Sequence, residues 1–180
     1  MKKFIALLRG INVSGQKQIK MSDLKSLFEK TGFQNVETYI QSGNVIFSSN
    51  EKSSEKLEQK ISSAIKKTFG FDVKVIVVTP EVINQVLKIN PFIKKKKDTD
   101  KLYVIFLSER PSKASIEKLA ETDFSPEEFI IKRKLVYLFV PNGYGKAKLN
   151  NNYFENKLKL FGTTRNLKTL KALAELTELH

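Results

Sequence analysis

The feature that most constrains the fold is a set of short segments that are apolar almost without interruption. Residues 4–8, 73–78, 102–107 and 135–140 read FIALL, VKVIVV, LYVIFL and LVYLFV. A strand with one face in water alternates apolar and polar residues, whereas a nearly continuous apolar strand is covered on both faces. These segments therefore predict strands that are buried on both sides.

The first half of the chain predicts the element order β-α-β-β-α-β. Two helices with one apolar face are expected at residues 22–30 and 53–69, and each is followed by a glycine that can end it. Ser22 is the expected N-cap of the first helix, because its hydroxyl can accept a backbone hydrogen bond. Four strands complete the pattern, at about residues 3–9, 36–41, 44–49 and 71–78. This order is typical of a ferredoxin-like fold, the alpha-beta plait, of class α+β.

The second half predicts the same order in a less regular form. Its expected strands are residues 102–107, 129–132 and 135–140, and its expected helices are 112–121, 151–160 and 164–179. The fourth strand of this half is expected to be missing or very short near Phe161.

These patterns divide the chain into three parts. Residues 1–90 are expected to form the first ferredoxin-like half with a short connecting helix, residues 91–101 a linker, and residues 102–180 the second half with a C-terminal helix. The run Lys94–Lys97 predicts that the linker is solvated. A ferredoxin-like sheet carries helices on one face only, so strands that are apolar on both faces predict that the two halves pack or join into one compact unit.

The positive charge is spread along the chain. The 180 residues carry a net charge of +13, and the segments 1–49, 50–100 and 101–180 contribute +4, +4 and +5. Nucleic-acid-binding proteins usually concentrate their charge, so a generally basic surface is favoured over a nucleic-acid interface. The aromatic residues Phe47, Tyr103 and Tyr137 are expected in the core, and not on an RNA-binding platform.

Several kinds of chemistry are excluded by composition. The chain has no cysteine, and its one histidine is the terminal His180, which leaves no Ser-His-Asp triad, Cys-His pair or histidine-rich metal site. Glu37, Tyr39 and Glu155 are candidates for acid–base chemistry, although structural hydrogen bonding is the commoner role of such groups. No apolar run approaches the length of a membrane span, and a cytoplasmic location without a membrane partner is expected. The sequence indicates neither a cofactor nor an oligomeric state.

Arginine is used sparingly. The chain contains only four arginines, Arg9, Arg110, Arg133 and Arg165, against 28 lysines. A planar guanidinium can bind an anion with two parallel hydrogen bonds, which lysine cannot do. Arg9 and Arg165 are therefore candidates for a specific role, and Arg110 and Arg133 are expected at the surface.

Four short motifs resemble a known bacterial family. The chain reads ALLRGINVSG at residues 6–15, TYIQSGNVIF at 38–47, GYG at 143–145 and TTRN at 163–166. Together they resemble domain of unknown function sixteen ninety-seven, with its patterns ALLRGINVGG, TYIQSGNVVF, GYG and TTRNWxT. The resemblance extends over essentially the whole chain and implies a fold and a motif set but no reaction. Ser14 and Leu167 depart from the family pattern, which has glycine and tryptophan there.

The two C-terminal motifs each allow two interpretations. Thr164 is expected to cap the last helix, and its N-terminus with Arg165 forms either an anion site or a cap with the arginine paired to Glu155. The GYG loop with Lys146 and Lys148 is either a phosphate cradle or a turn that leaves the preceding hairpin.

The motifs lead to one functional hypothesis with two alternatives. We expect an anionic small molecule, phosphorylated or nucleotide-like, to bind in a cleft lined by Arg9 and Arg165. The other expected ligand-binding residues share polar side chains within or beside the motifs, and they are Asn12, Ser42, Asn44, Glu155 and Asn166. The alternatives are a nucleic-acid-binding module and an enzyme that acts on a nucleotide or phosphorylated substrate without histidine or cysteine. No catalytic residue and no metal ligand is assigned.

Overall fold

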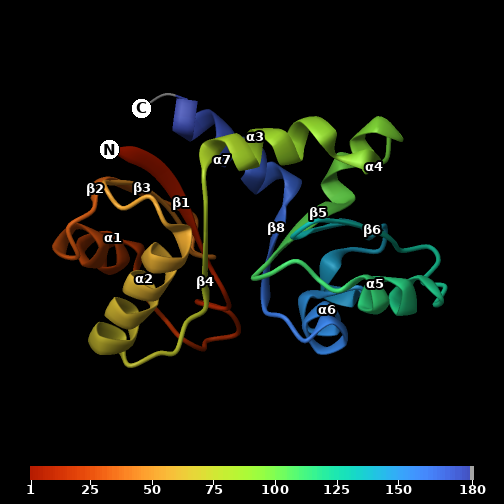
Figure 1. Ribbon diagram of the computed structural model, residues 1–180, viewed down its shortest axis with the longest axis horizontal. Coiled ribbons are helices and arrows are strands. Elements are labelled where there is room, and N and C mark those ends of the chain that lie inside the picture. The colour runs from red at the N-terminus through yellow and green to blue at the C-terminus, as the bar shows by residue number, and fades with distance from the viewer. Residues whose placement is uncertain (179–180) are drawn as a thin grey trace. The chain divides into compact units, whose positions relative to one another are not determined.

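The computed structural model describes residues 1–178, and the chain divides into two compact units (Figure 1). Unit 1 contains Met1–Asn84 and the C-terminal residues from Leu173 onward, and unit 2 contains Gln85–Ala172. The chain enters unit 2 within helix α3 (Pro80–Ile89) and leaves it within helix α7 (Leu167–Glu178). Each unit has a four-stranded antiparallel sheet, so the expected α+β class with two ferredoxin-like halves is confirmed.

Unit 1 follows the predicted β-α-β-β-α-β order. Its strands form a sheet in the order β2-β3-β1-β4. The elements are β1 (Lys2–Leu8), α1 (Met21–Lys30), β2 (Gln34–Tyr39), β3 (Asn44–Ser49), α2 (Ser54–Phe69) and β4 (Val75–Val78). Ser53 caps α2 by accepting a hydrogen bond from the Lys56 amide, and Gly70 ends the helix in the left-handed conformation.

The core of unit 1 lies between one face of this sheet and the helices α1 and α2. Phe4 and Phe47 stack across neighbouring strands with their ring centroids 5.8 Å apart, and Phe28 of α1 meets Phe47 edge-on at 5.5 Å. The apolar stripe of α2 buries Leu57, Ile61 and Ile65 in the same cluster. Burial of these side chains is what fixes the helices, and the loops between them, on the sheet.

The turn between β2 and β3 lies directly on the end of β1. Gly43 has a φ of +86°, and a Cβ built there would lie 2.8 Å from Leu8 Cβ and 2.7 Å from Ile11 Cδ1. The Leu8 amide also donates to the Gly43 carbonyl at 2.9 Å. Only glycine fits this position, and the contact joins two segments that are far apart in the sequence.

Unit 2 repeats the ferredoxin-like plan. Its sheet has the order β6-β7-β5-β8. The elements are α4 (Pro91–Lys94), the 3₁₀ turn η1 (Thr99–Lys101), β5 (Leu102–Leu107), α5 (Lys113–Ala120), β6 (Glu128–Lys132), β7 (Leu135–Phe139), the 3₁₀ turn η2 (Tyr144–Lys146), α6 (Asn151–Leu158) and β8 (Gly162–Asn166). The buried core contains Ile105 and Leu107 of β5, Leu138 of β7, and Leu119 and Phe154 of the two helices.

Two predictions about the C-terminal region are wrong. Residues 164–166, expected to begin the last helix, belong to β8. The fourth strand, expected to be missing or very short near Phe161, is β8, which has five residues and pairs with β5 from Tyr103↔Asn166 to Leu107↔Gly162. The β-branched Thr163 and Thr164 favour the extended conformation, and Gly162 allows a close approach to Ile105, whose Cγ2 would lie 2.8 Å from an added Cβ. The last helix therefore begins at Leu167. Its expected end at residue 179 and the terminal His180 lie outside the described residues.

The segment 91–101, expected as a linker, contains regular structure. Asn90 caps the short helix α4, and Phe92 is fully buried against Phe139 with ring centroids 6.3 Å apart. Within the lysine run, only Lys97 is half-buried, and its Nζ lies 4.6 Å from the Phe139 ring centroid and 2.6 Å from a Glu128 carboxylate oxygen. The expectation of full solvation is therefore wrong for Lys97, because its stem covers an aromatic side chain.

Candidate functional site

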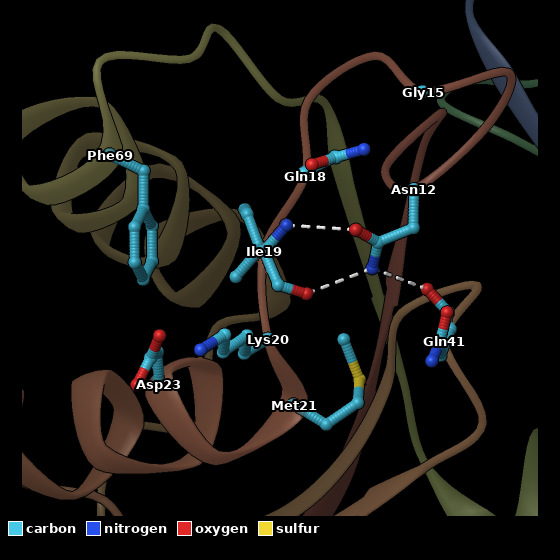
Figure 2. Close-up of a pocket in the computed structure, with 9 residues that line it drawn as sticks. All are labelled: Asn12, Gly15, Gln18, Ile19, Lys20, Met21, Asp23, Gln41 and Phe69. Carbon is cyan, nitrogen blue, oxygen red and sulfur yellow. Dashed lines mark hydrogen bonds between the residues drawn. The ribbon is translucent and has the colours of Figure 1, made fainter.

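An open pocket of about 450 Å³ lies in unit 1, where the loop after β1, the first turn of α1, the β2–β3 turn and the end of α2 meet (Figure 2). Its polar lining consists of three amide side chains, one ammonium and one carboxylate, and its apolar lining of three side chains and a glycine. The residues are Asn12, Gln18, Gln41, Lys20, Asp23, Ile19, Met21, Phe69 and Gly15.

Asn12 lines the pocket and joins two loops. Its Nδ2 donates to the carbonyl of Ile19 at 2.9 Å and to the carbonyl of Gln41 at 2.8 Å, and its Oδ1 accepts from the Ile19 amide at 2.8 Å (Figure 2). The RGIN and QSGN motifs are thus joined at this site. Because these bonds occupy both donors of the amide, Asn12 positions the pocket more than it binds a ligand.

The loop after Asn12 is a miniature hairpin. Val13 and Gln16 form an isolated antiparallel bridge, and the two residues between them, Ser14 and Gly15, have φ values of 50° and 74°. Two central residues with positive φ are the pattern of a type I′ turn, which explains why the family pattern has two glycines here. Lys17 fixes the hairpin to unit 1 by donating from Nζ to the Asp72 carbonyl at 2.7 Å.

Helix α1 begins at the pocket without a side-chain cap. Lys20 occupies the N-cap position with φ −66° and ψ 140°, and its side chain accepts no hydrogen bond from the helix. The prediction that Ser22 is the N-cap is wrong. The Leu24 amide donates to the Lys20 carbonyl at 3.0 Å, so the helix has already begun before Ser22, which lies in its first turn. The first amides of α1 therefore have no side-chain acceptor within residues 1–178, and this end of the helix carries a partial positive charge.

Four polar side chains of the pocket are available to a ligand. Gln18, Lys20, Asp23 and Gln41 are exposed, and their side chains make no hydrogen bond or ion pair with the part of the chain that the structure describes. In Figure 2 the Phe69 ring lies on one side of the view and Asn12 with Gln41 on the other, with Lys20 between them. A pocket with a few polar groups around an apolar wall is the usual form of a small-molecule site.

The remaining predicted residues of unit 1 do not line this pocket, and Glu37 lines a second one with Lys3 and Lys25. Asn44 is fully buried, and its Nδ2 donates to the Tyr39 carbonyl at 2.9 Å and to Ser42 Oγ at 3.2 Å, which holds the β2–β3 turn. Arg9 is half-buried, and its backbone amide donates to the Lys74 carbonyl at 2.9 Å. Glu37 is half-buried in β2.

Arg165 is a buried cation in unit 2. It is 6% exposed, and its Nη1 donates to Thr163 Oγ1 at 2.7 Å and to the Thr164 carbonyl at 2.8 Å. Burial lowers the pKa of Arg165 to about 10, so the guanidinium remains charged at neutral pH. Arg165 belongs to unit 2 and Arg9 to unit 1, and the cleft that the two were expected to share stays a prediction.

The other predicted residues of unit 2 hold its C-terminal motifs together. Tyr144 of the GYG loop shares a 2.9 Å hydrogen bond with the hydroxyl of Thr164, which is therefore a strand residue and not the predicted cap. Asn166 caps α7 instead, because its Oδ1 accepts from the Thr169 amide at 2.8 Å. Glu155 accepts from the Gly162 amide at 3.0 Å. The GYG and TTRN motifs thus meet in a hydrogen-bonded cluster within unit 2.

A comparison with protein-family models identifies the family of this chain, and the match includes the whole pocket. The model of a protein family of unknown function, DUF1697, matches residues 1–137. The chain belongs to the DUF1697 family. Among solved structures it is similar to the conserved bacterial protein SP0830 from Streptococcus pneumoniae, with a TM-score of 0.73, 22% sequence identity, and coverage of 96% of this chain and 97% of that one. This likeness shows a shared fold. No curated protein matches the chain.

Sequence reasoning missed most of the pocket in this DUF1697 chain. Gln18, Lys20 and Asp23 lie just after the RGIN motif, and a signal was present in the polar run that ends at Lys20 without a good capping residue before Met21. Phe69 gave no such signal, because it continues the apolar stripe of α2. No helix within residues 1–178 is long and apolar enough to cross a bilayer, and the same residues contain no group of three or more His, Cys, Asp or Glu placed to hold a metal ion.

Proposed function

We propose that this protein binds an anionic small molecule, and that the pocket at the start of α1 is the binding site. The observation that carries the proposal is the Asn12 side chain, which joins the RGIN loop to the QSGN turn and so places two motif segments around one cavity. Asn12, Ser42 and Asn44 are supports of the pocket in this account, and Lys20 is the group that meets the anion.

The electrostatics of the pocket support an anion. Lys20 contributes an ammonium at the same place where the first amides of α1 lack a side-chain acceptor. Helix N-termini favour negative charge by about 0.3–1 kcal/mol, and a nearby cation adds to this attraction. Asp23 opposes it in part, so the site suits an anionic group that lies closer to Lys20 than to Asp23.

The two arginines of the motifs give a separate route to the same function. A charged, buried guanidinium such as Arg165 stabilises a nearby anion more strongly than an exposed lysine does, since the low dielectric weakens screening. We therefore also propose that Arg9 and Arg165 bind the anion, and lysine substitutions test this. Replacing each with lysine keeps the charge but removes the planar fork, so a ligand contact loses affinity whereas a purely structural contact loses stability.

The proposed cellular location and the two alternative functions are those that the sequence suggested. The cysteine-free sequence supports the cytoplasm as the proposed location. Nucleic-acid binding ranks second, because two of the three candidate stacking residues, Phe47 and Tyr137, are fully buried. The third, Tyr103, is half-buried and stacks on Tyr144 with ring centroids 4.8 Å apart. An enzyme that acts on a nucleotide or phosphorylated substrate is compatible with the same pocket, but no catalytic residue is assigned.

The test is a binding titration with inorganic pyrophosphate at constant ionic strength. The Lys20→Gln variant should bind about tenfold more weakly than the wild type, because a charge-assisted contact is lost. Lys25→Gln removes the same charge from an exposed position of α1 outside this pocket and serves as the control. Equal affinities for both variants and the wild type would show that the pocket is not the anion site.

A further inference from the structure

We propose that the ligand of the unit 1 pocket is a mononucleotide, with its base against Phe69 and its phosphate at Lys20. This inference rests on the proposed function and narrows it from an anion to a substrate class. It follows from four features of the pocket: its size, its aromatic wall, its pair of side-chain amides and its carboxylate.

The size of the pocket exceeds what an inorganic anion needs. Its volume is about 450 Å³, within the range of roughly 300–1,000 Å³ that sites for drug-sized ligands occupy. Its lining extends from Phe69 at the end of α2 to Gln41 in the β2–β3 turn. A phosphate bound at Lys20 would leave most of this lining in contact with water, so the pocket favours a larger molecule that includes the anion.

Phe69 offers that molecule a flat apolar surface. The side chain is only half-buried, since one part of it packs on the core of unit 1 and another part lines the pocket. An aromatic ring held by a core on one side is a rigid platform for stacking, and every nucleobase has a π-face that can use it.

The two glutamine side chains match the edge of a base. Gln18 comes from the loop after β1 and Gln41 from the β2–β3 turn, and neither amide is used by the described part of the chain. Each primary amide has donors and an acceptor, which is the combination that pairs with the N–H and ring-nitrogen groups of a base. A simple sugar phosphate or an alkyl phosphate has no such edge.

Asp23 distinguishes a nucleotide from an anion alone. A carboxylate in the first turn of α1 repels a bare phosphate but accepts hydrogen bonds from hydroxyl groups, and ribose supplies these next to its phosphate. One ammonium and one carboxylate also fit a single nucleotide better than a polynucleotide, because binding along a nucleic-acid backbone requires several phosphate contacts.

The experiment compares adenosine 5′-monophosphate with ribose 5-phosphate by calorimetric titration of the full chain. The inference predicts that the nucleotide binds at least about tenfold more tightly, since stacking and amide contacts are added to the same phosphate contact. Phe69→Leu should remove most of this preference, because it weakens binding of the nucleotide far more than binding of ribose 5-phosphate. Phe71→Leu, a half-buried phenylalanine of the same core that does not line the pocket, is the matched control.

The outcomes separate this inference from the proposed function. Equal affinities for the two compounds, with Lys20→Gln weakening both, would overturn the nucleotide and leave the anion site standing. If neither compound nor pyrophosphate binds, both proposals fail. Tighter binding of single-stranded RNA with a steep salt dependence would overturn the inference in favour of a nucleic-acid interface.

Discussion

The two units share one plan but begin their first helix differently. In unit 2, α5 follows β5 after the short connection 108–112, and Ser112 caps it by accepting from the Ser115 amide at 3.2 Å. In unit 1, α1 follows β1 after the longer connection 9–20 and starts at Lys20 without a side-chain cap. Binding residues are often found on such long connections, which is why the proposed site is placed at the start of α1.

The hairpin turns of the two units also differ, since only the turn of unit 1 is joined to a neighbouring loop. The β6–β7 turn of unit 2 consists of Arg133 and Lys134, both exposed. The β2–β3 turn of unit 1 is instead joined to the preceding loop through Gly43, and through the carbonyl of Gln41, which accepts from Asn12. Unit 1 therefore has a pocket formed by two joined loops, whereas the corresponding connections of unit 2 are a short loop and an exposed turn. Where the chain offers one, each variant below is compared with a matched variant in unit 2.

The largest effect is expected for Gly43→Ala. The added Cβ would lie less than 3 Å from atoms of Leu8 and Ile11, and alanine is strained at a φ of +86°. Overpacking and the left-handed conformation together should cost about 3 kcal/mol of unfolding free energy. Gly70→Ala, at the end of α2, has a similar φ of +76° in the left-handed conformation with open space around it, and it should cost only about 1 kcal/mol. Equal losses in denaturant titrations would contradict the close contact at Gly43.

Asn12→Ala should have the next largest effect. The substitution leaves two carbonyls and one amide without their partner, and we expect a loss of about 2 kcal/mol. Asn166→Ala removes one capping bond in α7 and should cost about 1 kcal/mol. A loss at Asn12 no larger than at Asn166 would show that the two loops do not depend on this side chain.

Lys20→Ser tests the missing cap and should stabilise the protein. A serine at this extended N-cap position can accept from the first turn of α1, which is worth about 1 kcal/mol. The same variant should lose anion binding, because the ammonium is gone. Ser112→Ala is the mirror experiment in unit 2, with an expected loss of about 1 kcal/mol and unchanged binding. Thermal unfolding and a pyrophosphate titration of both variants measure the two effects, and a less stable Lys20→Ser protein would argue against an uncapped helix.

The smallest effect is expected for Ser14→Gly. Ser14 has a φ of 50° in the type I′ turn, where glycine is unstrained, but glycine also raises the entropy of the unfolded chain. The net gain should be about 0.5 kcal/mol, measured by chemical denaturation. A loss of stability would mean that the Ser14 side chain makes a stabilising interaction that outweighs the strain of its positive φ.

Hydrophobic patterning predicted most of the fold, because the strands and helices are fixed by burial. The nearly continuous apolar segments are strands, and residues 44–49 and 102–107 begin and end as predicted. The pattern failed at β8, whose residues Thr163, Thr164 and Arg165 carry no apolar alternation. The two β-branched threonines are a weak local signal, and pairing with β5 determines that strand.

The candidate site was only partly predictable for a related reason. The motifs pointed to Asn12 and the Ser42–Asn44 turn, and the structure places these at the pocket as its supports. The side chains that face a ligand come from neighbouring positions, and they depend on where α1 starts and where α2 ends. Ser22 is a better capping residue than Lys20 in isolation, so local propensity misplaced the start of α1 by a fraction of a turn and concealed its uncapped end.

The most direct test of the account is a nuclear magnetic resonance titration of the labelled protein with adenosine 5′-monophosphate, because the two units serve as each other's control. The account predicts that the backbone amides of residues 21–23 and 41 shift with ligand concentration, along with the Phe69 ring. The corresponding amides 113–115 at the capped start of α5 should remain unchanged. Shifts that are equal at the two helix starts, or confined to unit 2, would contradict the central claim that the uncapped start of α1 is the binding site.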